Sequence, residues 1–305
     1  MNSQETRCNW LDIAKGITIM LMVMGHSAIP HSLAVFIWAF HMPLFFIAAG
    51  WTTNWEKRTF FEYCIHRTKT LMLPFVSYSI VVCLVLSHHS SWKGVGYLLS
   101  HGWEGYPLWF IPVLFVASII SRAVYEVKST YFRLMLIFSL AMVGVVLDNN
   151  NIYLPWAMST VPYASFLVAW GGYIKHIVSP EKSNKIWILL CFLITLGISL
   201  FYRLDMAWNN ITPVIPLTIG AVSGTIMVFM LSSLIEKKCK TLSKILSSVG
   251  KETYIVVAFA SAVIMMINQY LTHNIIIKYI SLIFMLLIMC NVKNKINQKI
   301  KIKVF

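Results

Sequence analysis

The hydrophobic residues of this chain gather into long runs separated by short polar or basic segments. These runs lie at residues 11–31, 33–53, 71–88, 107–122, 132–148, 158–176, 186–203, 211–235, 253–270 and 275–291. As helices of roughly 17–25 residues, they match the about 30 Å of hydrocarbon in a bilayer. The pattern predicts an all-α polytopic membrane protein with about ten transmembrane helices.

The composition supports a membrane environment for the whole chain. Of 305 residues, 58% are hydrophobic and only 12% are charged, with a mean hydropathy of +0.72. Soluble domains carry more charge and less apolar surface. The sequence shows no Pro/Gly/Ser-rich linker and no shift in composition. We therefore expect residues 1–305 to form one transmembrane domain.

The net charge of +14 follows the predicted topology. If the N-terminus is cytoplasmic, only Lys93, Arg203 and Lys278 fall in outward segments, whereas the other basic residues outside the runs fall in inward segments. This bias is the positive-inside pattern of membrane proteins, and it predicts that both termini are cytoplasmic. The excess of bases is thus explained by topology and anionic lipid, and no nucleic-acid partner is expected.

The six cysteines give no sign of a disulfide framework or a metal centre. They are scattered along the chain without CxxC spacing. Structural zinc sites require closely spaced pairs of ligands. We expect free or packed thiols and no bound metal.

The first run, which contains "AKGITIMLMVMGHS" at 14–27, carries three ionisable residues on one helical stripe. Lys15 and His26 are eleven residues apart, which is close to three turns and roughly 16–17 Å along a helix. Asp12 lies near the same stripe and can pair with Lys15 at i,i+3. Each residue has an ordinary explanation: Lys15 as a snorkelling cation, Asp12 at a helix start, and His26 in an interhelical hydrogen bond.

The second run places another histidine at a similar depth. His41 precedes Pro43, which removes a backbone donor and is expected to loosen the helix just beyond the histidine. Because this helix runs back inward, His41 and His26 both lie toward the outer side. A neutral imidazole is a good general base near pH 7, and a second one can orient it or bind substrate. Proton relay and simple packing remain as alternatives.

These two helices together resemble the acyltransferase-3 family of integral-membrane acyltransferases, which includes bacterial O-antigen and capsule O-acetylases. The family opens with Leu-Asp-x-x-Arg/Lys-Gly, and its basic residue and histidine correspond here to Lys15 and His26, separated by residues 16–25. Its Phe-His-Met-Pro-Leu-Phe-Phe element is matched in full at 40–46.

Weaker similarities extend along the chain. The family's Arg-x-x-Arg-Leu-x-x-Pro segment is matched by Arg67, Leu71 and Pro74, whereas Thr70 replaces the second arginine and Lys69 stands beside it. "LWFIPVLF" at 108–115 and "VGKETYIVVAFAS" at 249–261 are similar to later family elements.

The resemblance implies transfer of an acetyl or other acyl group from cytoplasmic acyl-CoA to a hydroxyl of a cell-surface glycan or its lipid-linked precursor. It implies a multi-pass protein of the bacterial cytoplasmic (inner) membrane, with acetyl-CoA as co-substrate and membrane lipid around it. His26 would be the general base, and His41 would hold the acceptor or stabilise the oxyanion. The donor would meet the residues nearer the cytoplasm, which are Lys15, Asp12, Arg67 and Lys69.

Two further alternatives stay open. A proton-coupled transporter or flippase would use His26, His41 and Asp12 as a relay, although the middle runs lack the carboxylates that such a protein needs. The outward aromatic residues, including Trp109, either stack on a sugar or form the interfacial belt of a membrane protein. Asp205 beside Arg203, and Asp148 before three asparagines, are equally consistent with loop caps.

Overall fold

The computed structural model describes residues 8–26, 29–87, 96, 99–102, 107–182, 184–270, 281, 284 and 288. Within them the chain is helical, and the only strand-like pairing is an isolated bridge between Asp205 and Asn210. The α-helices are α1 (Asn9–Gly25), α2 (His31–Trp38), α3 (His41–Thr52), α4 (Phe60–Arg67), α5 (Leu73–Ser87), α7 (Phe110–Tyr125), α8 (Thr130–Asn149), α9 (Val161–Ile177), α10 (Lys185–Phe201), α11 (Val214–Lys238), α12 (Lys240–Lys251) and α13 (Thr253–Tyr270). The short helices are η1 (Thr68–Met72), η2 (Pro107–Trp109), η3 (Pro155–Thr160), η4 (Pro180–Lys182) and η5 (Met206–Trp208).

Four helical stretches among the described residues are long and apolar enough to cross a bilayer. They are His31–Thr52, Pro107–Tyr125, Thr130–Asn149 and Val214–Lys238, and Lys185–Phe201 is a shorter apolar helix. The predicted all-α membrane fold is therefore confirmed in outline. The number of ten spans and the orientation of the termini stay predictions, and most of the predicted last span, 275–291, lies outside the described residues.

The predicted second span is a broken helix, with the break just before His41 and not beyond it. α2 ends at Trp38, and Phe40 has φ −134° and ψ −17° before α3 begins. Pro43 has no N–H, so the carbonyl of Ala39 cannot receive its i+4 hydrogen bond. The proline thus interrupts the turn that precedes it, and it is well placed in the first turn of α3.

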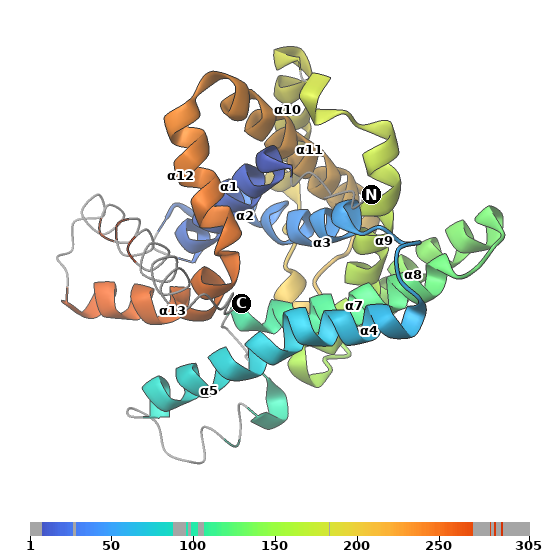
Figure 1. Ribbon diagram of the computed structural model, residues 1–305, viewed down its shortest axis with the longest axis horizontal. Helices are drawn as coiled ribbons and strands as arrows, with labels where there is room; N and C mark the ends of the chain where they lie inside the picture. Colours follow the sequence, from blue (N-terminus) through green and yellow to red (C-terminus); the bar gives the residue numbers. More distant parts are fainter. Residues whose placement is uncertain are drawn as a thin grey trace, which may run out of the picture.

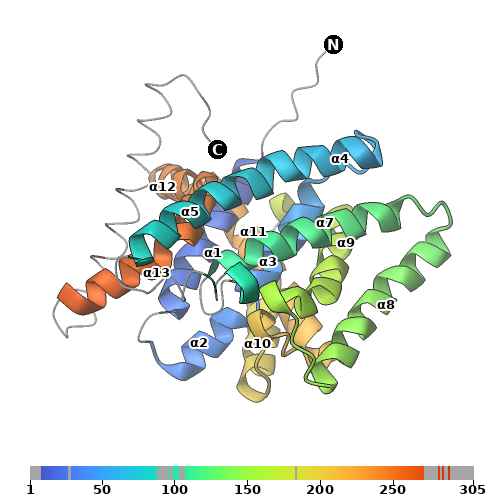
Figure 2. The same ribbon diagram turned by 90° about the horizontal axis from the view of Figure 1, so that it is seen from below.

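The loop after α3 and the predicted third span form one continuous helical rod. α4 begins at a capping box, in which the Thr59 side chain and backbone exchange hydrogen bonds with Glu62. α4 then passes through the π-helix η1 into α5 without a break. Figure 2 shows this rod along one side of the molecule and α2 and α10 on the opposite side.

α1 and α3 lie in the interior of the bundle, with α12 on one side and α9 on the other (Figure 1). Two backbone-to-backbone crossings hold them there. A Cβ added to Gly250 of α12 would lie 1.8 Å from the carbonyl oxygen of Asp12, and one added to Gly50 of α3 would lie 1.8 Å from that of Val168. Such small-residue crossings let membrane helices pack closely. α8 and α10 instead expose many apolar side chains outward.

Candidate active site

α1 and α3 form an antiparallel pair that is fixed by ring contacts at both ends. At one end the indoles of Trp10 and Trp51 meet edge to face, with ring centroids 5.6 Å apart. At the other end the imidazoles of His26 and His41 lie with centroids 6.4 Å apart and planes at 80°. The prediction that the two histidines lie at a similar depth is therefore confirmed.

His41 is buried and its ring is held by the broken helix. Its Nδ1 lies 3.1 Å from the carbonyl oxygen of Ile37 in α2. A carbonyl can only accept, so Nδ1 must carry the hydrogen. In neutral His41 the lone pair is then on Nε2, and His41 acts as an acceptor toward other groups.

His26 follows the last residue of α1 and its side chain is exposed at a cavity of about 250 Å³. Trp38 of α2 and His41 of α3 line the same cavity, and Trp109 lines it from η2. Much of the remaining wall comes from the segment 203–208, far along the chain. A neutral imidazole can accept a proton, so two of them at a cavity of this size form a candidate site for acid–base chemistry.

The segment 203–208 contributes charged groups that the sequence did not assign to a site. Arg203 pairs with Asp205 at 2.8 Å, and its guanidinium lies over the ring of Trp38 at 4.4 Å from the centroid. Asp205 therefore pairs with Arg203 and makes no side-chain cap for η5. Asp148, by contrast, does cap a loop, because it accepts hydrogen bonds from the backbone of Ile211 and Thr212. The available signal was that Arg203 is one of few outward basic residues.

Asp12 and Lys15 lie near the opposite end of α1. Asp12 is buried in the first turn, and Lys15 is half-buried on the following turn. Negative charge in a first helical turn is favourable, which agrees with one of the two explanations for Asp12. Their position relative to His26 is the predicted one, at opposite ends of the same helix.

A second cavity, of about 240 Å³, lies at the end of α3 that is remote from His41. Its lining is polar and comes from the end of α3, the following loop and α4: Thr52, Thr53, Asn54, Lys57, Arg58, Tyr63, His66 and Arg67. Arg67 is held in place, since Nε donates to the Tyr63 hydroxyl at 2.9 Å and Nη2 to the Thr53 hydroxyl at 3.1 Å. Fixed guanidinium groups are well suited to phosphate oxygens.

The ionisable side chains that line this cavity, apart from the Tyr63 phenol, are all basic. Burial, together with the neighbouring Arg58, Arg67 and Lys57, lowers the pKa of His66. Of the two predicted anion contacts, Arg67 lines the cavity, whereas Lys69 is exposed and does not. Lys57, Arg58 and His66 were missed, although they belong to the basic stretch "EKRTFFEYCIHRTK".

The geometry defines a helical membrane protein with a paired-histidine cavity and a basic cavity at opposite ends of α3. Comparison with protein families matches residues 9–292 to the acyltransferase-3 family, which is described as an acyltransferase domain. The chain belongs to this family and is a membrane acyltransferase. Comparisons with curated proteins and with solved structures found no match.

Proposed function

We propose that this protein moves an acetyl or other acyl group from cytoplasmic acyl-CoA to a hydroxyl of a cell-surface glycan or its lipid-linked precursor, in the bacterial inner membrane. One observation carries the proposal. α3 presents His41 to one cavity and Thr52 to the other, and its 12 residues span about 18 Å. Coenzyme A has the same two-ended chemistry, because a long pantetheine arm separates its thioester from its phosphates.

The chemical step begins with the acceptor hydroxyl beside His26. The neutral imidazole takes the hydroxyl proton while the oxygen attacks the thioester carbonyl carbon. The tetrahedral intermediate then collapses, the C–S bond breaks, and the coenzyme A thiolate takes the proton back from the imidazolium. Direct transfer needs no covalent enzyme intermediate. An acyl-histidine is the alternative, and it would be seen as label retained on the protein.

The hydrogen bond between His41 and Ile37 favours a holding role for His41 over oxyanion stabilisation. In this tautomer, neutral His41 has no second N–H to give to an oxyanion. Because each ring nitrogen lies about 1 Å from its centroid, the nearest nitrogens of the two rings are at least about 4 Å apart, too far for a direct hydrogen bond. One bridging oxygen can link His41 Nε2 to His26 N–H and so fix the tautomer of His26.

The donor end of the site is proposed to recognise the phosphates. Arg67 and its basic neighbours would bind the 3′-phosphate and pyrophosphate, with Lys69 outside them as a weaker long-range charge. Lys15 and Asp12 lie on α1 between this end and His26. Lys15 is proposed to contact the pantetheine or phosphate portion of the donor, with Asp12 in its first turn orienting it.

The test uses membranes that contain the protein and acetyl-CoA labelled in the acetyl group. Label should appear in a polymeric or lipid-linked glycan, and mass analysis of surface glycans with and without the gene should identify the sugar. His26→Ala should abolish transfer, whereas the matched control His31→Ala should not, because His31 is an exposed histidine on α2 that does not line the cavity. Wild-type transfer by His26→Ala would refute the role of the base, and solute transport without labelling would favour a transporter.

A further inference from the structure

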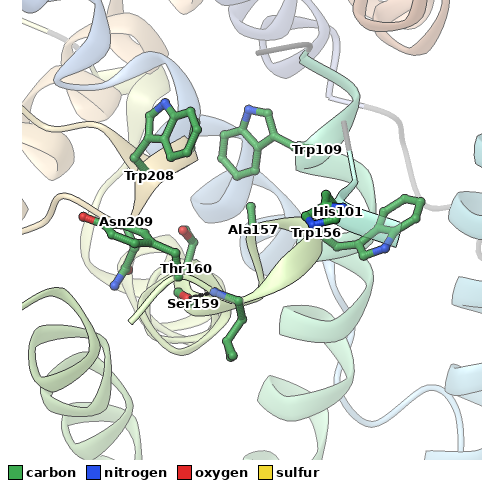
Figure 3. Close-up of a pocket in the computed structure, with 11 residues that line it drawn as sticks. His101, Trp109, Trp156, Ala157, Ser159, Thr160, Trp208 and Asn209 are labelled. Carbon is green, nitrogen blue, oxygen red and sulfur yellow. Dashed lines mark hydrogen bonds between the residues drawn. The ribbon is translucent and has the colours of Figure 1, made fainter. Parts of the chain in front are cut away.

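A smaller cavity of about 50 Å³ adjoins the histidine cavity, and the two share Trp109, Ala207 and Trp208. Figure 3 shows the indoles of Trp109 and Trp208 along one edge of it and Trp156 with His101 along another. The wall is completed by polar residues of η3 and the residue that follows η5, namely Ser159, Thr160 and Asn209. Nothing in the proposed chemistry uses this cavity.

The backbone around this cavity is held in an unusual conformation. Trp156, Ala157 and Asn209 have φ of 63°, 55° and 50°. They are three of the four non-glycine residues with positive φ in the part of the chain that the structure describes. L-residues rarely adopt this region, and such strain persists only where surrounding structure fixes it, most often at functional sites.

Hydrogen bonds to the polar wall provide that fixation. The Ser159 hydroxyl donates to Ile152 O at 2.7 Å and accepts from Leu154 N at 2.7 Å. The Thr160 hydroxyl donates to Met206 O at 2.5 Å, which ties η3 to η5. The two strained segments are therefore joined into one wall, and the shape of the cavity is built in before any ligand arrives.

Asn209 lines this wall and carries a buried acceptor that is unpaired within the described part of the chain. The side chain is 1% exposed, and its Nδ2 donates to Gly144 O at 3.1 Å. That bond fixes which end of the amide is the oxygen, and Oδ1 is buried with no hydrogen-bond partner among the described residues. Buried acceptors are almost always paired in proteins, so the unpaired Oδ1 marks this wall as incompletely satisfied without a ligand or a water molecule.

The tryptophans decide what kind of ligand fits. Trp109 is only 7% exposed, so it is no part of an aromatic belt facing lipid headgroups, whereas Trp208 is 51% exposed at the rim. A sugar ring has an apolar C–H face that packs on an indole and hydroxyls that hydrogen-bond around its edge. The combination of indoles with buried hydroxyl and amide groups matches this amphipathic ligand.

We propose that this cavity is a saccharide subsite of the acceptor. The sugar that carries the reacting hydroxyl lies in the histidine cavity and stacks on Trp208, and an exocyclic group such as a hydroxymethyl enters the smaller cavity. A volume of about 50 Å³ holds only a few atoms, since one water needs about 10–15 Å³ on the same measure. This inference rests on the proposed function and names the residues that select its acceptor.

The test compares Trp208→Ala with the matched control Trp187→Ala, which removes an exposed indole from α10. Acyl transfer is measured with labelled acetyl-CoA and with oligosaccharides released by mild acid from the surface glycan of the source strain. Trp208→Ala should raise the KM for oligosaccharide about tenfold, as expected for the loss of one aromatic stacking contact, and leave the KM for acetyl-CoA unchanged. Trp208→Phe should restore most of the loss, and Trp187→Ala should resemble wild type.

A binding measurement separates the subsite from the chemistry. In the His26→Ala background the same oligosaccharides are titrated and tryptophan fluorescence is followed, with and without Trp208→Ala. One outcome is that saccharide binding depends on Trp208 although even the wild-type protein transfers no acyl group. This outcome would support the subsite and refute the proposed function. Normal transfer with an acceptor KM that Trp208→Ala does not change would overturn the subsite and keep the function.

Discussion

The imidazoles of His26 and His41 meet edge to face at 6.4 Å, and only His41 is fixed by a backbone carbonyl. The two rings therefore differ in freedom. His26 is exposed at the end of α1, so its ring can change orientation when a substrate binds. His41 is buried between α2 and α3. A fixed imidazole that orients a freer one is the arrangement expected of a general base and its supporting group.

His41→Asn should separate the structural role of His41, its hydrogen bond to Ile37, from its chemical role as a proton acceptor. The asparagine amide can donate to Ile37 O as Nδ1–H does, so folding should be preserved, but it removes the imidazole base. We expect kcat to fall about 10- to 100-fold, less than the roughly 10²- to 10⁴-fold loss for His26→Ala, with donor KM unchanged. Steady-state transfer assays check this. A wild-type kcat for His41→Asn would show that His41 only packs.

Arg67→Ala and Lys69→Ala should behave differently although the residues are neighbours in sequence. Arg67 lines the basic cavity and is held by Tyr63 and Thr53, whereas Lys69 is exposed outside it. Arg67→Ala should raise the KM for acyl-CoA roughly tenfold or more, the usual effect of losing a charge-assisted hydrogen bond, and Lys69→Ala should change it less than about twofold. Equal effects of the two variants would contradict a phosphate site at this cavity.

Binding of coenzyme A should be accompanied by proton uptake at His66. In the free protein, burial and the neighbouring Arg58, Arg67 and Lys57 hold the pKa of His66 below its ordinary value of 6.5. A bound phosphate stabilises the imidazolium and raises that pKa, so His66 takes up a proton at a pH between the free and bound values. Its contribution to affinity therefore grows as pH falls through the bound-state pKa.

Titration calorimetry of coenzyme A at about pH 6.5, in two buffers of different ionisation enthalpy, measures this uptake directly. His66→Gln is the matched control, because the phosphates of coenzyme A titrate in both proteins and only the difference belongs to His66. Equal proton uptake by wild type and His66→Gln would contradict the prediction.

Helical periodicity was enough to predict which residues of α1 share one face and that His41 of the next helix lies near His26. The eleven-residue spacing puts Lys15 and His26 on one stripe, and the antiparallel return of the next helix brings His41 to the depth of His26. The prediction that the helix loosens beyond His41 is wrong, because a proline leaves unpaired the carbonyl four residues before it, and the break therefore precedes His41.

The rest of the site could not be read from periodicity. Arg203 and Asp205 reach the histidine cavity from a loop whose position is set by tertiary contacts, such as Thr160 to Met206. Arg67 and Lys69 are both basic in the sequence, yet residues two apart on a helix point in nearly opposite directions, and only Arg67 lines the basic cavity. The residue pattern along one helix does not indicate which distant loop packs against that helix.

Gly250→Ala should disrupt the fold, because the crossing of α1 and α12 has no room for a side chain. The added Cβ would lie 1.8 Å from the carbonyl oxygen of Asp12 and 2.8 Å from the backbone nitrogen of Gly16, and backbone cannot move aside as a flexible side chain would. This crossing joins the two family-like segments "LDIAKG" and "VGKETY". We expect a destabilisation of at least about 1–3 kcal/mol, as for other overpacked interiors.

Gly197→Ala is the matched control, since a Cβ at this glycine of α10 meets nothing within 4 Å. Alanine is the better helix former by about 0.5–1 kcal/mol, so this variant should be as stable as wild type or slightly more so. Size-exclusion profiles and melting temperatures in detergent compare the two variants. Because α1 also carries Lys15 and His26, Gly250→Ala should lose acyl transfer together with the folded fraction. A monodisperse Gly250→Ala protein with a wild-type melting temperature would show that α1 and α12 do not pack in direct backbone contact.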